Sequence, residues 1–139
     1  MRLTSLFIAV SLMATPALAG DKTEGWARWV DRAERIEAAL DSGEVNYKAN
    51  LKAACTGVTG SVVGMGFGPP YWAQGLIQVC TVLKEDWIYK NGKAQCKDVR
   101  RVIGIINKAT PVPEAPRAEP VAKHIAAMMQ AAYDGQCKR

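Results

Sequence analysis

The sequence predicts an all-α fold, a small bundle of about five helices stapled by disulfide bonds. Apolar side chains recur three and four residues apart in almost every segment, which is the period of an amphipathic helix. Glycine and proline stand where these periodic segments end. Four cysteines, an even number, lie downstream of a segment typical of an export signal, and this context favours two disulfide bonds.

Met1–Ala19 is typical of a cleavable signal peptide. Arg2 supplies the positive charge, and Leu6–Met13 is an apolar run much shorter than the ~20 residues that a membrane-spanning helix needs. Ala17-Leu18-Ala19 provides a small-x-small cleavage site. The sequence therefore predicts a single helical domain over residues 20–139, located in the periplasm or secreted.

The first helix is expected over residues 23–41. Asp21 would cap its N-terminus, with Glu24 as the partner in a capping box, and Ser42-Gly43 would end it. Its apolar stripe consists of Trp26, Val30, Ala33, Ile36 and Leu40. We leave open whether Trp26 and Trp29 pack within one chain or across the two-fold interface of a homodimer.

The second helix is expected over residues 46–62. Its stripe consists of Tyr47, Leu51, Cys55, Val58 and Val62. Gly57, Gly60 and Gly64 weaken its second half, because each glycine costs up to ~1 kcal/mol relative to alanine in a helix. The run Gly64–Pro70, Gly-Met-Gly-Phe-Gly-Pro-Pro, cannot continue a helix and is expected to form a loop.

Three further helices are expected over residues 71–89, 94–107 and from about Pro120 to the Asp134-Gly135 pair. Between the last two, residues 110–120 carry four prolines, which predicts an extended, polyproline-like strap on the surface. The predicted inward faces are Trp72, Leu76, Cys80, Leu83 and Trp87, then Cys96, Val99, Ile103 and Ile106, then Val121, Ile125, Met128 and Ala132.

Four cysteines allow three disulfide pairings, and the helix pattern favours one of them. If the second and third helices form an antiparallel hairpin about Phe67, then Cys55 and Cys80 lie at nearly the same height, ~18 and ~20 Å from the turn at 1.5 Å per residue. This pairing leaves Cys96 to bond with Cys137, across the proline-rich strap.

The charge pattern and the residue types argue against several classes of function. The formal net charge is +5. A basic region in the second half is expected to form a solvated face or to meet an acidic partner or an anionic envelope polymer; it consists of Lys84, Lys90, Lys93, Lys97, Arg100, Arg101 and Lys108. Nucleic acid is not expected to be a partner of an exported protein. The only histidine, His124, has no neighbouring nucleophile and the cysteines lack metal-ligand spacing, so we expect no enzyme, no metal and no cofactor.

An uncharged run from Ala53 to Leu83 is the most unusual feature of the chain. Glycines and prolines interrupt it, so it is not expected to span a membrane. One interpretation is a core hairpin. The other is that Gly64–Trp72 presents apolar and aromatic side chains to a protein partner, and the predicted partner-binding residues are Met65, Phe67, Tyr71 and Trp72.

The chain also resembles a known family. The signal peptide, the order of four cysteines, and the run from Cys96 to Cys137 carry the resemblance; this run has Cys-x-x-Val, then Val102-Ile103, a proline-bearing segment, an alanine-rich helix and Ala-Ala-Tyr-Asp-Gly-Gln-Cys137. In these features it is similar to the Rap/Tai group of type VI secretion amidase immunity proteins. The resemblance implies a dimeric, non-enzymatic inhibitor that blocks a cell-wall hydrolase toxin, a peptidoglycan amidase, in the periplasm.

Two other function classes remain open from the sequence. The proline-rich strap and the basic residues around the fourth helix would suit a structural component of the envelope or of a secretion system. The uncharged hairpin would suit a carrier that encloses a lipid or another apolar ligand.

Overall fold

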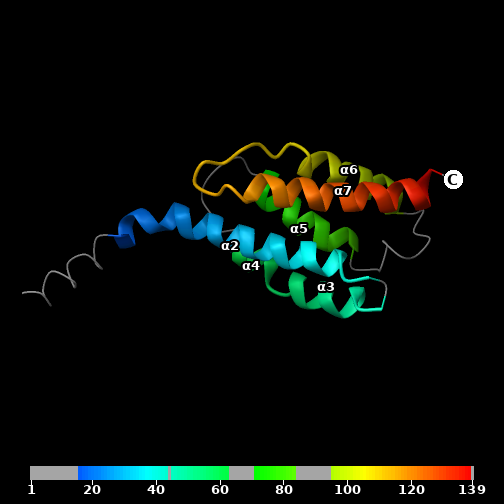
Figure 1. The fold of residues 1–139 in the computed structure, drawn as a ribbon, viewed down its shortest axis with the longest axis horizontal. Coiled ribbons are helices and arrows are strands. Elements are labelled where there is room, and N and C mark those ends of the chain that lie inside the picture. Colours follow the sequence, from blue (N-terminus) through cyan, green and yellow to red (C-terminus); the bar gives the residue numbers. More distant parts are fainter. Residues whose placement is uncertain (1–15, 44, 63–70, 84–94, 139) are drawn as a thin grey trace, which may run out of the picture.

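The computed structural model describes residues 16–43, 45–62, 71–83 and 95–138, with side chains from Thr23 onward. Every regular element in these ranges is a helix, which confirms the predicted all-α class (Figure 1). The helices are α2 (Pro16–Leu40), α3 (Tyr47–Cys55), α4 (Val58–Val62), α5 (Tyr71–Leu83), α6 (Cys96–Ile106) and α7 (Ala118–Cys137).

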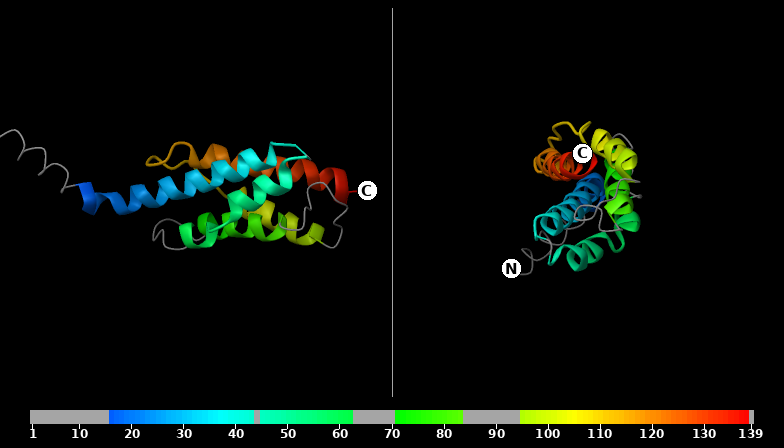
Figure 2. Two further views of the ribbon diagram at one scale, coloured as in Figure 1. Left: turned by 90° about the horizontal axis from the view of Figure 1, so that it is seen from below. Right: turned by 90° about the vertical axis from the view of Figure 1, so that its right-hand side faces the viewer.

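The helices pack around one core, and five of them form a closed ring of contacts. α2 packs against α4 and α7, α7 packs against α6, α6 packs against α5, and α5 returns to α4. α3 lies outside this ring and packs mainly against α2. The end-on view shows the helices surrounding the centre of the molecule (Figure 2).

Every predicted apolar stripe faces the core where the structure describes it. Ala33 and Ile36 of α2, Leu76 of α5, Val99 of α6 and Ile125 of α7 are completely buried. The cysteines, Val30, Met128 and Ala132 are half-buried at the edge of this core. The structure adds buried residues that the stripes had left out, among them Trp29, Ala39, Val79, Val102, Ala122 and Met129.

α2 begins earlier than the sequence pattern predicts. The helix starts at Pro16 and runs through Asp21, so Asp21 is not an N-cap and the predicted start at residue 23 is wrong for the full chain. Proline is favoured in the first turn of a helix, and the following Ala17-Leu18-Ala19 are good helix formers, so no residue there stops the helix. Its end at Leu40 agrees with the prediction.

The helix predicted over residues 46–62 is broken in two. α3 ends at Cys55 and α4 begins at Val58, because Gly57 adopts a φ of 76°, which is accessible to glycine and rare for other residues. The carbonyl of Thr56, freed from the helical ladder, accepts a hydrogen bond of 3.0 Å from Nη1 of Arg32 on α2. The break therefore also attaches α3 and α4 to α2.

The last helix begins close to the predicted residue and ends later than predicted. α7 starts at Ala118, with Pro120 in its first turn, and continues through Gly135 to Cys137. Asp134 accepts hydrogen bonds from Lys138 Nζ, at 3.1 Å, and from Gln130 Nε2, at 2.8 Å. Both hydrogen bonds lower the pKa of Asp134 below its usual value, and the one from Lys138 has the larger effect. These contacts span the last two turns, so the Asp134-Gly135 pair does not end the helix.

The proline-rich strap is less extended than predicted. The amide of Ala115 donates to the carbonyl of Val112, and the amide of Ala118 donates to that of Ala115, each at 3.0 Å, so the strap contains turns. Ala115 is buried and anchors the strap on the core. Two side-chain contacts fasten the start of the following helix to α2: an ion pair of Arg117 with Glu34 at 2.6 Å, and a hydrogen bond between Nδ1 of His124 and Oε2 of Glu37 at 2.7 Å.

Both predicted disulfide bonds are present. Cys55 of α3 bonds to Cys80 of α5 with a Cα–Cα distance of 5.7 Å, and Cys96 of α6 bonds to Cys137 of α7 with a Cα–Cα distance of 5.9 Å. The second bond joins the start of α6 to the end of α7, as expected. Among the described residues, none of the helices combines the length and the apolar character that crossing a bilayer would need.

Candidate functional site

An aromatic cluster formed by Trp26, Trp29, Tyr71 and Trp72 lies where α2 meets the start of α5. The ring of Trp72 is 5.0 Å from that of Trp26 and 4.9 Å from that of Trp29, both in edge-to-face geometry. Tyr71 stacks on Trp72 with the ring centroids 5.6 Å apart. Such aromatic pairs each contribute ~0.5–1.5 kcal/mol beyond the burial of their surface, so this cluster fixes the start of α5 on α2.

A buried hydrogen bond reinforces the aromatic cluster. Nε1 of Trp29 donates to the backbone carbonyl of Trp72 at 2.7 Å. The carbonyls in the first turns of a helix normally accept from within the helix, so this contact adds a second, tertiary donor at the N-terminal end of α5. Trp26 and Trp29 are 3% and 1% exposed, which places both side chains in the core of a single chain.

The structure describes two of the four predicted partner-binding residues, Tyr71 and Trp72. Met65 and Phe67 lie outside the described residues. Tyr71 is half-buried, with one ring face against Trp72. Trp72 is only 3% exposed, so it is a core residue whose side chain is not available to a partner.

The described residues on each side of segment 63–70 are firmly attached to the core. Val62, the last residue of α4, is completely buried, and Trp72, in the first turn of α5, is held by the aromatic cluster. The segment that contains Met65 and Phe67 therefore connects two fixed points. Trp29, which holds Trp72 in place, is not in the apolar stripe predicted from the sequence. Its position three residues after Trp26 places both side chains on one helix face and could have identified it.

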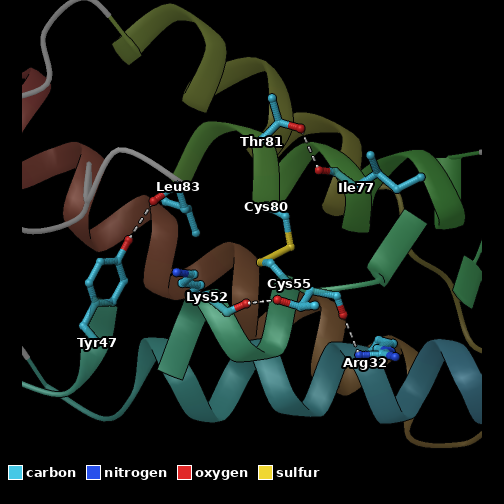
Figure 3. Close-up of a disulfide and its surroundings, with 9 residues drawn as sticks. Arg32, Tyr47, Lys52, Cys55, Ile77, Cys80, Thr81 and Leu83 are labelled. Carbon is cyan, nitrogen blue, oxygen red and sulfur yellow. Dashed lines mark hydrogen bonds between the residues drawn. A yellow bond between two sulfur atoms is a disulfide. The ribbon is translucent and has the colours of Figure 1, made fainter. Parts of the chain in front are cut away.

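A second candidate site is a cavity of about 280 Å³ between α3 and α5, which we call the α3–α5 cavity. Its lining includes Cys55 and Cys80, which are joined by a disulfide bond (Figure 3). Nearby, Oη of Tyr47 donates to the carbonyl of Leu83 at 3.3 Å, which provides another link between α3 and α5 (Figure 3). The cavity is lined by Lys48, Leu51, Lys52, Cys55, Thr56, Cys80 and Leu83.

The predicted basic region is a solvated surface where the structure describes it. Lys97, Arg100, Arg101 and Lys108 are all exposed on α6 or just after it. Arg101 contacts Oε1 of Gln78 at 3.3 Å and lies 3.9 Å from the carboxylate of Asp98. Lys84, Lys90 and Lys93 lie outside the described residues.

The described residues show no arrangement suited to metal binding. His124 is exposed, and its Nδ1 forms a hydrogen bond with the carboxylate of Glu37 on α2. In the ranges that the structure covers, no three His, Cys, Asp or Glu side chains gather in a way that could hold a metal ion. All four cysteines are in disulfide bonds.

The sequence matches no protein-family model and no curated protein, and the structure matches no solved structure.

Proposed function

We propose that this protein is an exported, non-enzymatic binding protein that attaches to a protein partner through segment 63–70 and the adjoining Tyr71, and blocks that partner. The observation that carries the proposal is the anchoring of this segment: an uncharged run with Met65 and Phe67 connects the buried end of α4 to the aromatic cluster at the start of α5.

The anchoring matters for affinity because ordering a flexible surface on binding costs free energy. Each side chain that loses its rotamer freedom costs ~0.5–1.5 kcal/mol, in addition to the cost of ordering a loop. The helix ends on both sides of the segment, at Val62 and Trp72, are already fixed on the core and do not need to be ordered on binding. Methionine and aromatic residues are enriched in the centres of protein interfaces, which suits Met65, Phe67 and Tyr71 as contact residues.

The resemblance to the Rap/Tai group supports a particular class of partner. A cell-wall hydrolase toxin, specifically a peptidoglycan amidase, would act in the compartment to which the N-terminal export-signal pattern directs the chain. The two disulfide bonds suit an oxidising compartment of this kind. We therefore propose an immunity function, with the periplasm as the site of action.

The proposal is tested by capture followed by an inhibition assay. The oxidised protein is used as bait in periplasmic extract, stoichiometric partners are identified by mass spectrometry, and the purified partner is assayed on peptidoglycan with increasing amounts of the protein. We expect a soluble hydrolase whose activity falls to its minimum near equimolar protein. Capture of membrane secretion subunits alone, or a hydrolase that stays fully active in the complex, would contradict the proposal.

A further inference from the structure

The outer face of α6 carries a cluster of cations. Lys97, Arg100 and Arg101 are exposed on α6, and at about 100° per residue their side chains fall within one sector of about 100°. Lys108 is exposed just after the helix, and its amide donates to the carbonyl of Ile105 at 3.2 Å, so it continues the last turn. We call Lys97, Arg100, Arg101 and Lys108 the α6 cationic face. α6 lies at the periphery of the bundle in the end-on view (Figure 2).

Gly104 leaves the middle of the α6 cationic face open. Three or four residues separate it from Arg100, Arg101 and Lys108, so these side chains are its neighbours on the helix surface. No atom lies within 4 Å of the position that a Cβ of residue 104 would take. Three cations therefore surround a space that an anionic group such as a phosphate can enter without displacing a side chain.

The charge of the α6 cationic face is mostly uncompensated. Over residues 95–109 the formal side-chain charge is +3, because four basic residues stand against one acid, Asp98. The carboxylate of Asp98 is 3.9 Å from Arg101. Among the residues that the structure describes, Lys97, Arg100 and Lys108 have no carboxylate partner.

α7 contributes a further cation beside the α6 cationic face. Nζ of Lys123 donates to the carbonyl of Asn107 at 2.6 Å, which places an ammonium group at the C-terminal end of α6. The surface of α2 is different, since Arg35 is 3.2 Å from the carboxylate of Asp31 and its charge is compensated there. Cations that lack such partners keep their charge for a ligand from outside the molecule.

The residue types of the α6 cationic face favour a membrane surface over a protein partner. The centres of protein interfaces are enriched in aromatic residues and methionine, whereas every exposed residue of α6 is charged or is glycine. The apolar side chains of α6 that would insert between lipids are buried in the core instead, namely Val99, Val102, Ile103 and Ile106. Attachment through this face therefore depends on charge, as it does for polybasic segments at anionic lipid headgroups.

We propose that the α6 cationic face docks on the phosphate headgroups of an anionic phospholipid membrane. A headgroup phosphate would lie at Gly104, between Arg100 and Lys108. The attachment is peripheral and reversible, and it holds the protein at the membrane surface. This inference goes beyond the proposed inhibitor function and uses residues outside segment 63–70 and Tyr71.

Vesicle flotation tests the proposal. The probes are vesicles of equal parts phosphatidylglycerol and phosphatidylcholine, with phosphatidylcholine alone as the neutral probe. The oxidised protein is used after removal of its export signal, because apolar residues 6–13 would bind either vesicle. We expect binding to the anionic vesicles only, and weaker binding as ionic strength rises. Each basic residue near such a surface contributes about fivefold in affinity, so Arg100→Gln/Lys108→Gln should bind about 25-fold more weakly.

Two comparisons separate the α6 cationic face from net charge. Arg35→Gln/Lys52→Gln is the matched control, because it removes the same two residue types and the same charge from exposed positions on α2 and α3. It should bind anionic vesicles much more tightly than the α6 double variant. Gly104→Glu and Gly104→Gln have similar size and enter open space, so both should fold. The glutamate should weaken vesicle binding at least about fivefold relative to the glutamine.

The proposal is overturned if neutral vesicles bind equally well, if salt does not weaken binding, or if either comparison gives two variants of equal affinity. It is also overturned if Arg100→Gln/Lys108→Gln binds vesicles normally and loses inhibition of the captured hydrolase, because the face would then serve the protein partner. Inhibition through segment 63–70 is measured without vesicles, so failure of vesicle binding leaves the proposed function standing.

Discussion

Trp29 joins α2 to the start of α5. Its indole packs against the rings of Trp26 and Trp72, while its Nε1 donates to the carbonyl of Trp72. One side chain therefore provides both apolar burial and a directed tertiary contact. Losing this hydrogen bond removes ~0.5–1.5 kcal/mol, the typical net contribution of an intramolecular hydrogen bond.

We expect Trp29→Phe to lower the free energy of unfolding by about 2–3 kcal/mol. The variant loses the hydrogen bond to Trp72, worth ~1 kcal/mol or more, and leaves a space beside two rings. Urea denaturation of the oxidised protein measures the change. Val45→Ala is the control, since Val45 is 93% exposed and should shift stability by less than about 0.5 kcal/mol. Equal stability of the two variants would show that Trp29 has no anchoring role.

At the scale of the elements, four glycines that lie within or between helices have different structural roles. Gly57 breaks a helix with positive φ, Gly75 allows α5 to approach α6, and Gly60 and Gly104 lie in helices with no atom close to their missing side chains. Helix propensity alone would treat all four alike as weak helix formers. Their roles differ because they depend on the tertiary contacts of each position.

Gly57→Ala and Gly60→Ala should change stability in opposite directions. Alanine at residue 57 must adopt the left-handed conformation, which costs ~1–2 kcal/mol. Alanine at residue 60 lies within α4 in open space and should add up to about 1 kcal/mol through its higher helix propensity. Thermal denaturation of both variants checks the prediction. A gain in stability for Gly57→Ala would show that the break between α3 and α4 does not require glycine.

Gly75→Ala and Gly104→Ala form a second contrasting pair. A Cβ at residue 75 would lie 2.8 Å from Cδ1 of Ile106, which is buried, so α5 and α6 or the isoleucine must shift. Overpacking of this kind costs ~1–3 kcal/mol, which exceeds the gain in helix propensity. Gly104 has nothing within 4 Å, and its alanine variant should be stabilised by up to about 1 kcal/mol. Denaturant midpoints that rise for both variants would rule out a close contact between α5 and α6.

The helical period predicts most of the fold because it identifies the residues that face inward. The stripe through Ala33 and Ile36 and the stripe through Leu76 and Leu83 are buried as the spacing requires. Helix ends are less predictable. Asp21 is a good capping residue, yet favourable residues precede it and the helix runs through it.

At the scale of the whole molecule, two disulfide bonds each join a pair of helices. Cys55–Cys80 ties α3, which lies outside the ring of packed helices, to α5. Cys96–Cys137 ties the start of α6 to the end of the chain across the proline-rich strap. The residue count about a predicted hairpin gives the first pairing, although the helix before the turn is broken at Gly57, and elimination gives the second.

Removing either disulfide should cost stability of similar size. The sequence separations are 25 and 41 residues, for which the loop-entropy relation gives about 3.5 and 3.9 kcal/mol. We expect Cys55→Ser/Cys80→Ser and Cys96→Ser/Cys137→Ser each to lower the unfolding free energy by about 3–4 kcal/mol in urea titrations. A loss below about 1 kcal/mol for either pair would mean that packing alone fixes those helices.

The candidate site was only partly predictable from the sequence. Trp72 lies both in the helical stripe with Leu76 and Leu83 and beside the apolar loop, and tertiary packing, which the pattern does not contain, places it in the core. A test of partner binding should therefore not alter Trp72, because its substitution would disturb the aromatic cluster. The α3–α5 cavity could not be found from sequence, since it arises from the separation between two helices.

The central claim is that segment 63–70 provides the contact with a protein partner. The most direct measurement compares the affinity of the captured hydrolase for the wild-type protein and for Met65→Ala/Phe67→Ala, with urea titration to confirm that the variant is folded and Val45→Ala as control. We predict at least about tenfold weaker binding for the double variant, the effect of truncating interface anchors, and unchanged binding for Val45→Ala. Wild-type affinity in a folded double variant would contradict the account.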